Sequence, residues 1–192
     1  RHGARESSRL PDWHANDYGY WCQLHVRLHH CDVHLRKMIV ETAQLLSTTH
    51  YIINGYTPAY KPTHKNHPCA VWIRESSNNY KWTYELLTSL INEFEYRFDK
   101  QHATKIHLSS LKTIPKLPDI ERTEFVLVMP DEFKTGNVTH SYQIYLNNKF
   151  KEWASRSNRP VYATYTKTPK PYFISWKIIK MIDTYIRSYY AV

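Results

Sequence analysis

The chain has 192 residues, a formal net charge of +9 at pH 7 and a hydrophobic content of 42 %. This length suits one domain with a real core, and no apolar run approaches the roughly 18 residues that cross a membrane. The first nine residues are polar and basic, unlike a signal peptide. Three cysteines are too few for a disulfide framework. We therefore expect a cytoplasmic monomer with no membrane association.

Charge and aromatic content indicate the kind of partner. The chain contains sixteen tyrosines and six tryptophans. Positive charge attracts phosphate backbones, and aromatic faces stack on unpaired bases. The composition therefore favours DNA or RNA over an acidic small molecule, the alternative being a basic, tyrosine-rich domain without such a partner. With only four glycines and no GxGxxG or GxxxxGK[ST] motif, it argues against a dinucleotide fold or a P-loop kinase.

The predicted elements begin after an irregular N-terminal extension at residues 1–30, and residues 31–192 form the predicted helical domain. A helix is predicted at about 32–50 with Asp32 as its N-cap. A polar loop broken by prolines follows. Pro68 opens a short helix that ends near residues 76–78, and a long helix follows at about 79–100.

The second half of the chain contains more prolines. Pro115 and Pro118 exclude a long helix within 103–128, where residues 125–128 are the one candidate extended segment. A turn or short helix is predicted at 131–134, a helix at about 138–155, and a last amphipathic helix from about Trp176. The predicted fold is mainly α, a single domain of four to five helices with long proline-rich loops.

An apolar arc and a polar stripe lie side by side on the helix predicted at 32–50. At 100° per residue, the arc contains Leu35, Met38, Ile39, Thr42, Leu45, Leu46 and Thr49. The stripe contains His34, Lys37, Glu41, Gln44 and Thr48, spaced three and four residues apart. Because it borders the core, a proton acceptor, an amine and an amide could line a cleft there. The alternative is an ordinary Lys37–Glu41 surface ion pair beside a histidine at the helix boundary.

A second group of candidate residues surrounds the helix start near residue 77. Free backbone N–H groups at a helix start bind phosphate, and Arg74 could add a bidentate contact. Tyr80 or Trp82 could stack on a base. The alternative is a capped helix with core tryptophans, which we expect for Trp72. In the next helix, Glu93 and Arg97 are four residues apart and are expected to pair.

Other chemistries have weaker support. Glu95 lies off the apolar face unless it points into a cleft with Tyr96 and His102. A zinc site could use residues from one further set: Cys22, His25, His29, His30, Cys31, His34 and Cys69. No CxxC, HExxH or GxSxG motif accompanies them. The sequence therefore predicts no metal and no other cofactor.

Several blocks in order across residues 31–155 resemble small phage proteins that are commonly labelled pyrimidine-dimer DNA glycosylases. The first block is Cys31-Asp32-x-His34-x-x-Lys37-Met38-Ile39-x-Glu41-Thr42-Ala43-Gln44-Leu45-Leu46. Later blocks are His67-Pro68, Trp72-x-Arg74-x-Ser76-x-x-Asn79-Tyr80-x-Trp82, Glu93-x-x-Tyr96-Arg97-Phe98 with Lys100 and His102, Met129-Pro130-Asp131-Glu132-Phe133-Lys134, and Tyr142-x-x-Tyr145 with Lys149, Phe150 and Trp153. The family is remotely related to dimer glycosylases of the endonuclease V type, which use an N-terminal α-amine as nucleophile. About thirty residues precede the first block here, so the resemblance does not transfer that amine.

The resemblance implies a DNA glycosylase in the cytoplasm of a bacterial or phage-infected cell, which flips a damaged or modified pyrimidine into a pocket. Glu41 would stabilise an oxocarbenium-like sugar or activate a water. Lys37 would hold a phosphate or form a Schiff base as a lyase, and His34 belongs to the same catalytic set. The implied base and backbone contacts are Gln44, Arg74, Asn79, Tyr80, Trp82, Arg97, His102 and Lys149.

Two alternatives to this function stay open. One is a transferase that elaborates a hydroxymethylated pyrimidine in phage DNA, which would need a donor substrate. The other is a non-catalytic nucleic-acid-binding protein that uses the same basic and aromatic surface. Formation of abasic sites distinguishes the glycosylase from both.

Overall fold

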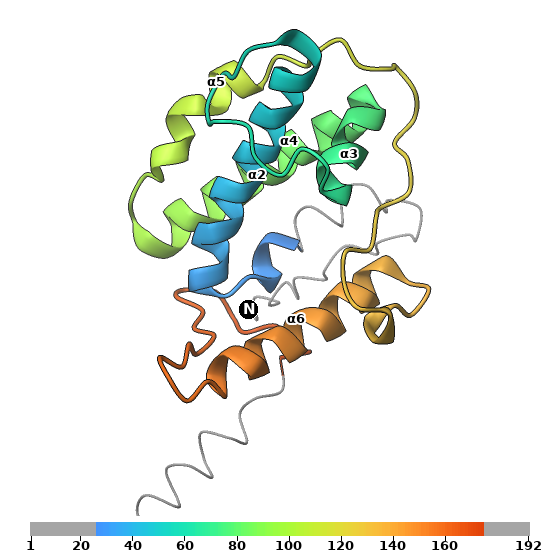
Figure 1. The fold of residues 1–192 in the computed structure, drawn as a ribbon. Coiled ribbons are helices and arrows are strands. Elements are labelled where there is room, and N and C mark those ends of the chain that lie inside the picture. Colours follow the sequence, from blue (N-terminus) through green and yellow to red (C-terminus); the bar gives the residue numbers. More distant parts are fainter. Residues whose placement is uncertain (1–25, 175–192) are drawn as a thin grey trace, which may run out of the picture.

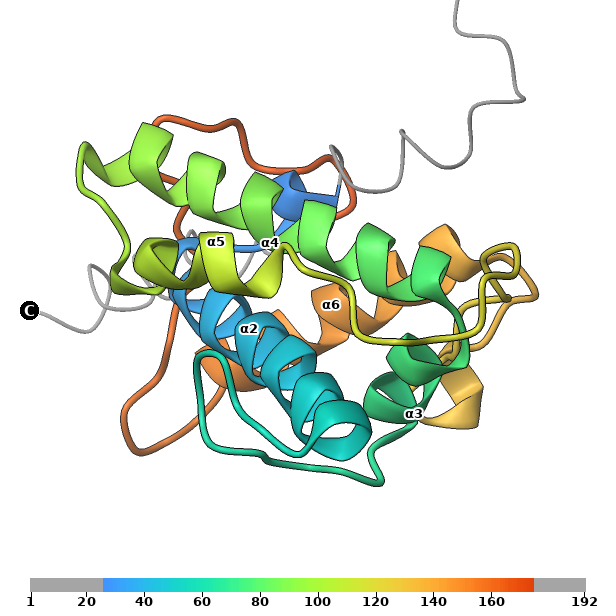
Figure 2. The same cartoon turned by 90° about the horizontal axis from the view of Figure 1, so that it is seen from above.

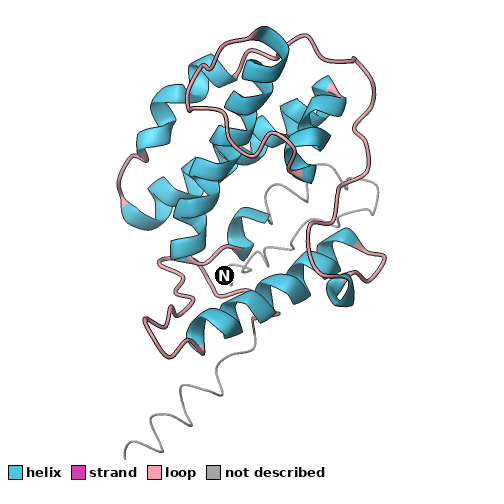
Figure 3. Ribbon diagram, in the orientation of Figure 1, coloured by secondary structure: helices cyan, strands magenta, loops and turns pink. Residues whose placement is uncertain are grey.

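The computed structural model describes residues 26–174, which form helices and loops without a strand (Figure 3). Besides a helical stretch at 26–29, it contains α2 (Asp32–Asn54), α3 (Pro68–Glu75), α4 (Ser77–Phe98), η1 (Ala103–His107), α5 (Leu108–Leu111), η2 (Asp131–Phe133) and α6 (Val138–Ala154). The elements labelled η are short 3₁₀ helices. The predicted helical class is confirmed.

Helices α2 and α4 pack against each other and form the centre of the fold, with α3 against both (Figures 1 and 2). The arc predicted on α2 is its core face, since Leu35, Ile39 and Leu46 are fully buried. From α4, Leu87 and Leu90 join the same cluster. Burying a leucine or isoleucine side chain stabilises a fold by about 1.5–3 kcal/mol, so this seam fixes how the two long helices lie.

The predicted start of α3 is confirmed, because Pro68 is its first residue. At α2 the prediction is wrong, because Cys31 is the N-cap and Asp32 is the first helical residue. The Asp32 carboxylate accepts hydrogen bonds from a distant loop and is not used as a cap. Helix α4 begins slightly earlier than predicted, after Ser76, whose side chain accepts hydrogen bonds from two backbone N–H groups.

A long loop follows one side of the molecule from α5 to α6 (yellow in Figure 1). No strand forms at residues 125–128 within the described chain. Instead Phe125 packs against Trp72 and Trp82, at ring-centroid distances of 5.1 and 4.7 Å. This loop therefore packs over the two tryptophans through Phe125.

Helix α6 crosses the start of α2, on the side of the molecule away from α5 (Figure 1). A second, smaller core forms there around Cys31, Leu146, Phe150, Ala163 and Ile174. Residues 26–29 are helical, which corrects the irregular structure predicted for them. The helix predicted from Trp176 lies outside the described residues. Among the helices of residues 26–174, none has the length and apolarity needed to cross a bilayer.

Candidate functional site

The polar stripe of α2 is buried at both of its ends. At the first end, the His34 ring meets Phe150 and Trp153 of α6 edge-on, with centroids 5.6 and 5.7 Å apart. At the other end, the Thr48 hydroxyl donates to the Thr63 carbonyl at 3.1 Å and accepts from the Thr63 N–H at 3.0 Å. Only the middle of the stripe therefore remains open to a ligand.

That middle section contains Lys37, Glu41 and Gln44. Lys37 Nζ lies 3.2 Å from Glu41 Oε1, and the two side chains are 52 % and 44 % exposed. Gln44 is partly buried one turn further on. This geometry matches the ordinary surface ion pair, and it also leaves a carboxylate and an amine accessible beside the core.

A second lysine approaches the same region from α6. Burial, followed by the charges of Lys149 and Lys37, lowers the pKa of His34 to about 3. The Lys149 ammonium lies over the rings of Tyr145 and Trp153, at 5.3 and 5.8 Å from their centroids. Two lysines from separate helices therefore flank one buried imidazole, which makes this part of the surface electropositive.

His34 itself is placed as a packing residue. Its ring is 4 % exposed, and its Nδ1 lies 2.9 Å from Nδ1 of His30. Burial comes first among the causes that lower the pKa of both histidines, so both are neutral at pH 7 and one donates to the other. The predicted catalytic role of His34 is corrected accordingly, because the ring holds α2 against α6 and does not face a substrate.

The predicted phosphate site at the start of α4 is covered by the protein's own loop. The Ser77 N–H donates to the Pro118 carbonyl at 2.8 Å, and the Ser76 hydroxyl donates to the Ile120 carbonyl at 2.8 Å. Asn79 is fully buried and exchanges hydrogen bonds with Thr123 at 2.8 and 3.0 Å. The N–H groups expected to bind phosphate are therefore satisfied internally.

The structure does not join the two groups of candidate residues in one site. Within residues 26–174, no hydrogen bond or ion pair joins Lys37 or Glu41 to Arg74 or Asn79. Arg74 Nη1 donates to the Ala70 carbonyl at 2.8 Å, and burial lowers the pKa of this guanidinium. Arg74 therefore supports its own helix.

Of the two aromatic residues predicted to meet a base, Tyr80 belongs to the core and Trp82 is partly buried against it. Tyr80 is fully buried, and its hydroxyl donates to the Leu111 carbonyl at 2.7 Å, so its ring offers no free face for stacking. Trp82 meets Trp72 edge-on, with centroids 5.8 Å apart. The expectation that Trp72 is a core residue is confirmed, since it is 4 % exposed.

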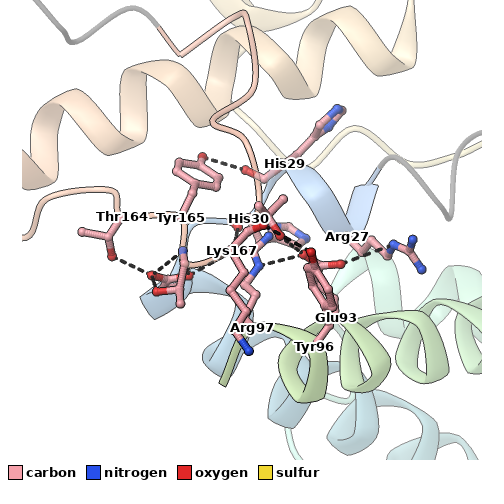
Figure 4. A network of polar contacts seen from close by, with 12 residues as sticks. Arg27, His29, His30, Glu93, Tyr96, Arg97, Thr164, Tyr165 and Lys167 are labelled. Atoms are coloured by element: carbon pink, nitrogen blue, oxygen red, sulfur yellow. Dashed lines mark hydrogen bonds and ion pairs between the residues drawn. The ribbon is translucent and has the colours of Figure 1, made fainter. Parts of the chain in front are cut away.

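Arg97 is the centre of a buried network of charges (Figure 4). Its side chain is fully buried; Nε donates to Glu93 Oε1 at 2.8 Å, and Nη1 lies 3.2 Å from Asp32 Oδ1 and 2.9 Å from the His30 carbonyl. The predicted Glu93–Arg97 pair is confirmed. The predicted contact of Arg97 with DNA is corrected, because the guanidinium is enclosed by the protein.

Threonines of the loop before residue 174 complete this network. Thr164 and Thr166 donate their hydroxyls to Asp32 Oδ2 at 2.9 Å, and Thr168 donates to Glu93 Oε1 at 2.7 Å. Burial opposes ionisation of Asp32, but hydrogen bonds from the Thr166 N–H and from the Thr164 and Thr166 hydroxyls, together with the Arg97 contact, outweigh it and lower the pKa of the carboxyl. The network ties the start of α2, the end of α4 and this loop together.

A cavity of about 380 Å³ lies beside the network. Its lining includes Arg27, Asn92, Glu93, Tyr96 and Lys167, of which several are labelled in Figure 4. The Glu93 carboxylate is occupied by internal partners, so the cavity wall offers no free acid from this residue. We therefore assign the network a structural role.

The remaining candidates lie near the end of α4. Glu95 is less accessible than Glu41, and both of its carboxylate oxygens accept from Lys105 Nζ, at 2.8 and 2.9 Å. His102 accepts a hydrogen bond from the Thr104 N–H at 3.2 Å and lines another cavity. In the part of the chain that is described, no group of three or more His, Cys, Asp or Glu side chains could hold a metal ion. Cys22 and His25 lie outside it.

Comparison with protein-family models, with curated proteins and with solved structures finds no match to this chain. Of the residues predicted to act on a substrate, Lys37 is exposed and six others are partly accessible: Glu41, Gln44, Arg74, Trp82, His102 and Lys149.

Proposed function

We propose that this protein is a DNA glycosylase that releases a damaged or modified pyrimidine base. One observation carries the proposal: the Lys37–Glu41 pair, alone among the predicted acid–base residues of α2, keeps both charged groups accessible. The net charge of +9 supports a polyanionic substrate. The Lys37 and Lys149 charges beside His34 would attract the phosphates that flank the target nucleotide.

Hydrolysis of the bond between base and sugar can be described with two side chains, Glu41 and Lys37. In hydrolysis, the bond between the base nitrogen and C1′ breaks, and its electron pair leaves with the base, which is then protonated. The Glu41 carboxylate stabilises the positive charge that develops on the sugar and accepts a proton from the water that attacks C1′. Lys37, at 3.2 Å, holds a phosphate beside it.

The test is base release by the purified chain, measured by mass spectrometry on ultraviolet-irradiated DNA and on DNA with hydroxymethylated pyrimidines. Glu41→Gln keeps the size and hydrogen-bonding capacity of the side chain but removes its charge. It should slow base release by about 10²–10⁴ with nearly unchanged DNA affinity. Glu121→Gln, the same change at an exposed glutamate of a distant loop, is the matched control.

A Lys37→Ala variant separates the two roles of the amine. If Lys37 only binds phosphate, its loss weakens binding, and borohydride traps no covalent complex with the wild type. Trapping that depends on Lys37 identifies a Schiff base and a lyase step. Wild-type base release by Glu41→Gln would contradict the proposal.

The other two functions give different products. A transferase increases the mass of the base without an abasic site, and a binding protein leaves the DNA unchanged.

A further inference from the structure

A second cavity of about 380 Å³ lies between α2 and the end of α4, lined by Arg36, Phe94, Phe98, Lys100 and His102. Small-molecule sites typically have volumes of about 300–1,000 Å³. Successive side chains on a helix point about 100° apart. Arg36 and its neighbour Lys37 therefore face different directions, and this cavity is separate from the Lys37–Glu41 site.

The cavity wall is a cluster of rings. Phe94 and Phe98 have centroids 4.8 Å apart, and the His102 ring meets Phe94 edge-on, also at 4.8 Å. The Arg36 guanidinium carbon lies 4.5 Å from the Phe98 centroid. All three rings are partly buried, so packing holds them in place while part of each remains open. Rings and guanidinium planes of this kind are surfaces on which nucleobases stack.

The cations of this cavity lack carboxylate partners. No ion pair within the described residues involves Arg36 or Lys100, and both side chains are exposed. The three carboxylates nearby in sequence are paired elsewhere: Glu93 with Arg97, Glu95 with Lys105, and Asp99 with Lys167. Two uncompensated positive charges at one cavity favour a ligand that carries a phosphate.

His102 adds a neutral donor. Burial and then the Arg36 charge lower the pKa of its ring, so it is neutral at pH 7. Because Nδ1 accepts the Thr104 N–H, the ring proton is on Nε2. The cavity thus combines two cations, an aromatic wall and one neutral N–H donor.

We propose that this cavity binds a nucleotide, with the base against Phe94 and Phe98 and the phosphate held by Arg36 and Lys100. A nucleotide has a flat ring that can contact the aromatic side chains and a phosphate that can contact the two cations. The nucleotide is either a free monophosphate or one unit of a DNA strand. The proposal does not depend on the chemistry of Glu41, because the two sites share no residue.

Calorimetric titration of the full chain with thymidine 5′-monophosphate tests the proposal. Because both halves of the ligand contribute, this probe should bind at least about tenfold more tightly than thymidine or inorganic phosphate alone. Arg36→Gln and Lys100→Gln should each weaken its binding by about tenfold. Lys116→Gln, at an exposed lysine of the loop after α5, should leave it unchanged.

Phe98→Leu keeps an apolar side chain and should weaken binding of the monophosphate but not of inorganic phosphate. A thermal unfolding midpoint close to that of the wild type shows that each variant is folded. A 5′-phosphorylated thymidine tetranucleotide distinguishes the two sources of ligand. If it binds in an Arg36-dependent manner and the monophosphate does not, the ligand is a strand nucleotide.

The proposal is overturned if neither probe binds, or if neither Arg36→Gln nor Lys100→Gln changes the affinity. The Glu41→Gln variant should bind the monophosphate like the wild type. Loss of base release without loss of nucleotide binding therefore concerns only the Lys37–Glu41 site, and the two proposals can fail independently.

Discussion

His34 is surrounded by a second imidazole, two aromatic rings and two lysines, and these neighbours decide its charge. A protonated ring there would lose water without gaining an anion. The folded protein therefore keeps His34 and His30 neutral, although free histidine titrates near pH 6.5. The same residue that the sequence marks as a candidate base is thus a pH-sensitive part of the α2–α6 contact.

This arrangement predicts that stability falls on mild acidification. The folded-state pKa of His34 is about 3, so between pH 6.5 and 3 the unfolded chain binds a proton that the folded chain does not. The free energy of unfolding should fall by about 1.4 kcal/mol per pH unit for each such histidine as pH decreases. Urea unfolding at pH 7, 6 and 5 measures it.

The control for this prediction is His34→Gln, which removes one titrating group and should flatten the pH dependence by about one proton. His50 and His102, whose pKa values are also lowered chiefly by burial, contribute in the same direction and remain in the variant. Asp32 acts only at lower pH, because its carboxyl pKa lies below the usual value. An unchanged slope in the variant would rule out His34 as the source.

Arg97 gives a second prediction at the scale of the residue. Arg97→Met keeps an unbranched side chain that can pack like the arginine stem, but it leaves the Asp32 and Glu93 carboxylates buried without their cation. Removing one partner of a buried ion pair costs about 3–5 kcal/mol, so the unfolding midpoint should fall sharply. Lys105→Met breaks the more exposed pair with Glu95, and its cost should stay below about 1 kcal/mol. Equal effects of the two substitutions would contradict the structural role of the network.

At the scale of the element, local patterns were sufficient for α2, α3, α4 and α6, but not for the helical residues 26–29 or the short helices at 103–111. The spacing of Leu35, Ile39 and Leu46 predicts the core face of α2, and Pro68 predicts the start of α3. The same patterns could not predict the partners of polar groups, because those lie far away in the chain. Asp32 meets Thr164, 132 residues later, and Asn79 meets Thr123, 44 residues later.

The prediction of the candidate site residues was wrong in part for the same reason. A polar residue beside an apolar arc can face a ligand or another segment, and periodicity gives the face but not what covers it. Lys37 and Glu41 remain accessible, whereas Asn79 and Arg97 are covered by loops or neighbouring helices. The alternating threonines at positions 164, 166 and 168 are the sequence signal for a row of hydroxyls able to satisfy buried carboxylates.

The junction of α3 and α4 carries a prediction about one element. The Ser76 side chain caps α4 by accepting from the N–H groups of Asn78 and Asn79, and it donates to Ile120. Ser76→Ala should therefore lower the free energy of unfolding by about 1–2 kcal/mol. Ser77→Ala is the control, because the Ser77 hydroxyl makes only an exposed contact with Asp119. Chemical denaturation of both variants measures the difference, and a loss confined to Ser77→Ala would contradict the assignment of the cap.

For the whole molecule, charge is the property on which the proposed binding to DNA depends. The chain carries a formal net charge of +9. Each DNA phosphate that a lysine or arginine neutralises releases counterions. On duplex DNA, each such contact adds about −0.9 to the slope of log K against log salt. We expect a steep negative slope between about 50 and 200 mM salt, measured by fluorescence anisotropy with a labelled duplex. Lys149→Gln should make that slope shallower by about 0.9, because Lys149 and Lys37 flank the same imidazole of His34. Lys116→Gln provides the matched control. A flat plot for the wild type would exclude this electrostatic contribution and favour a small-molecule substrate, and an unchanged slope in Lys149→Gln would place the DNA on another face of the molecule.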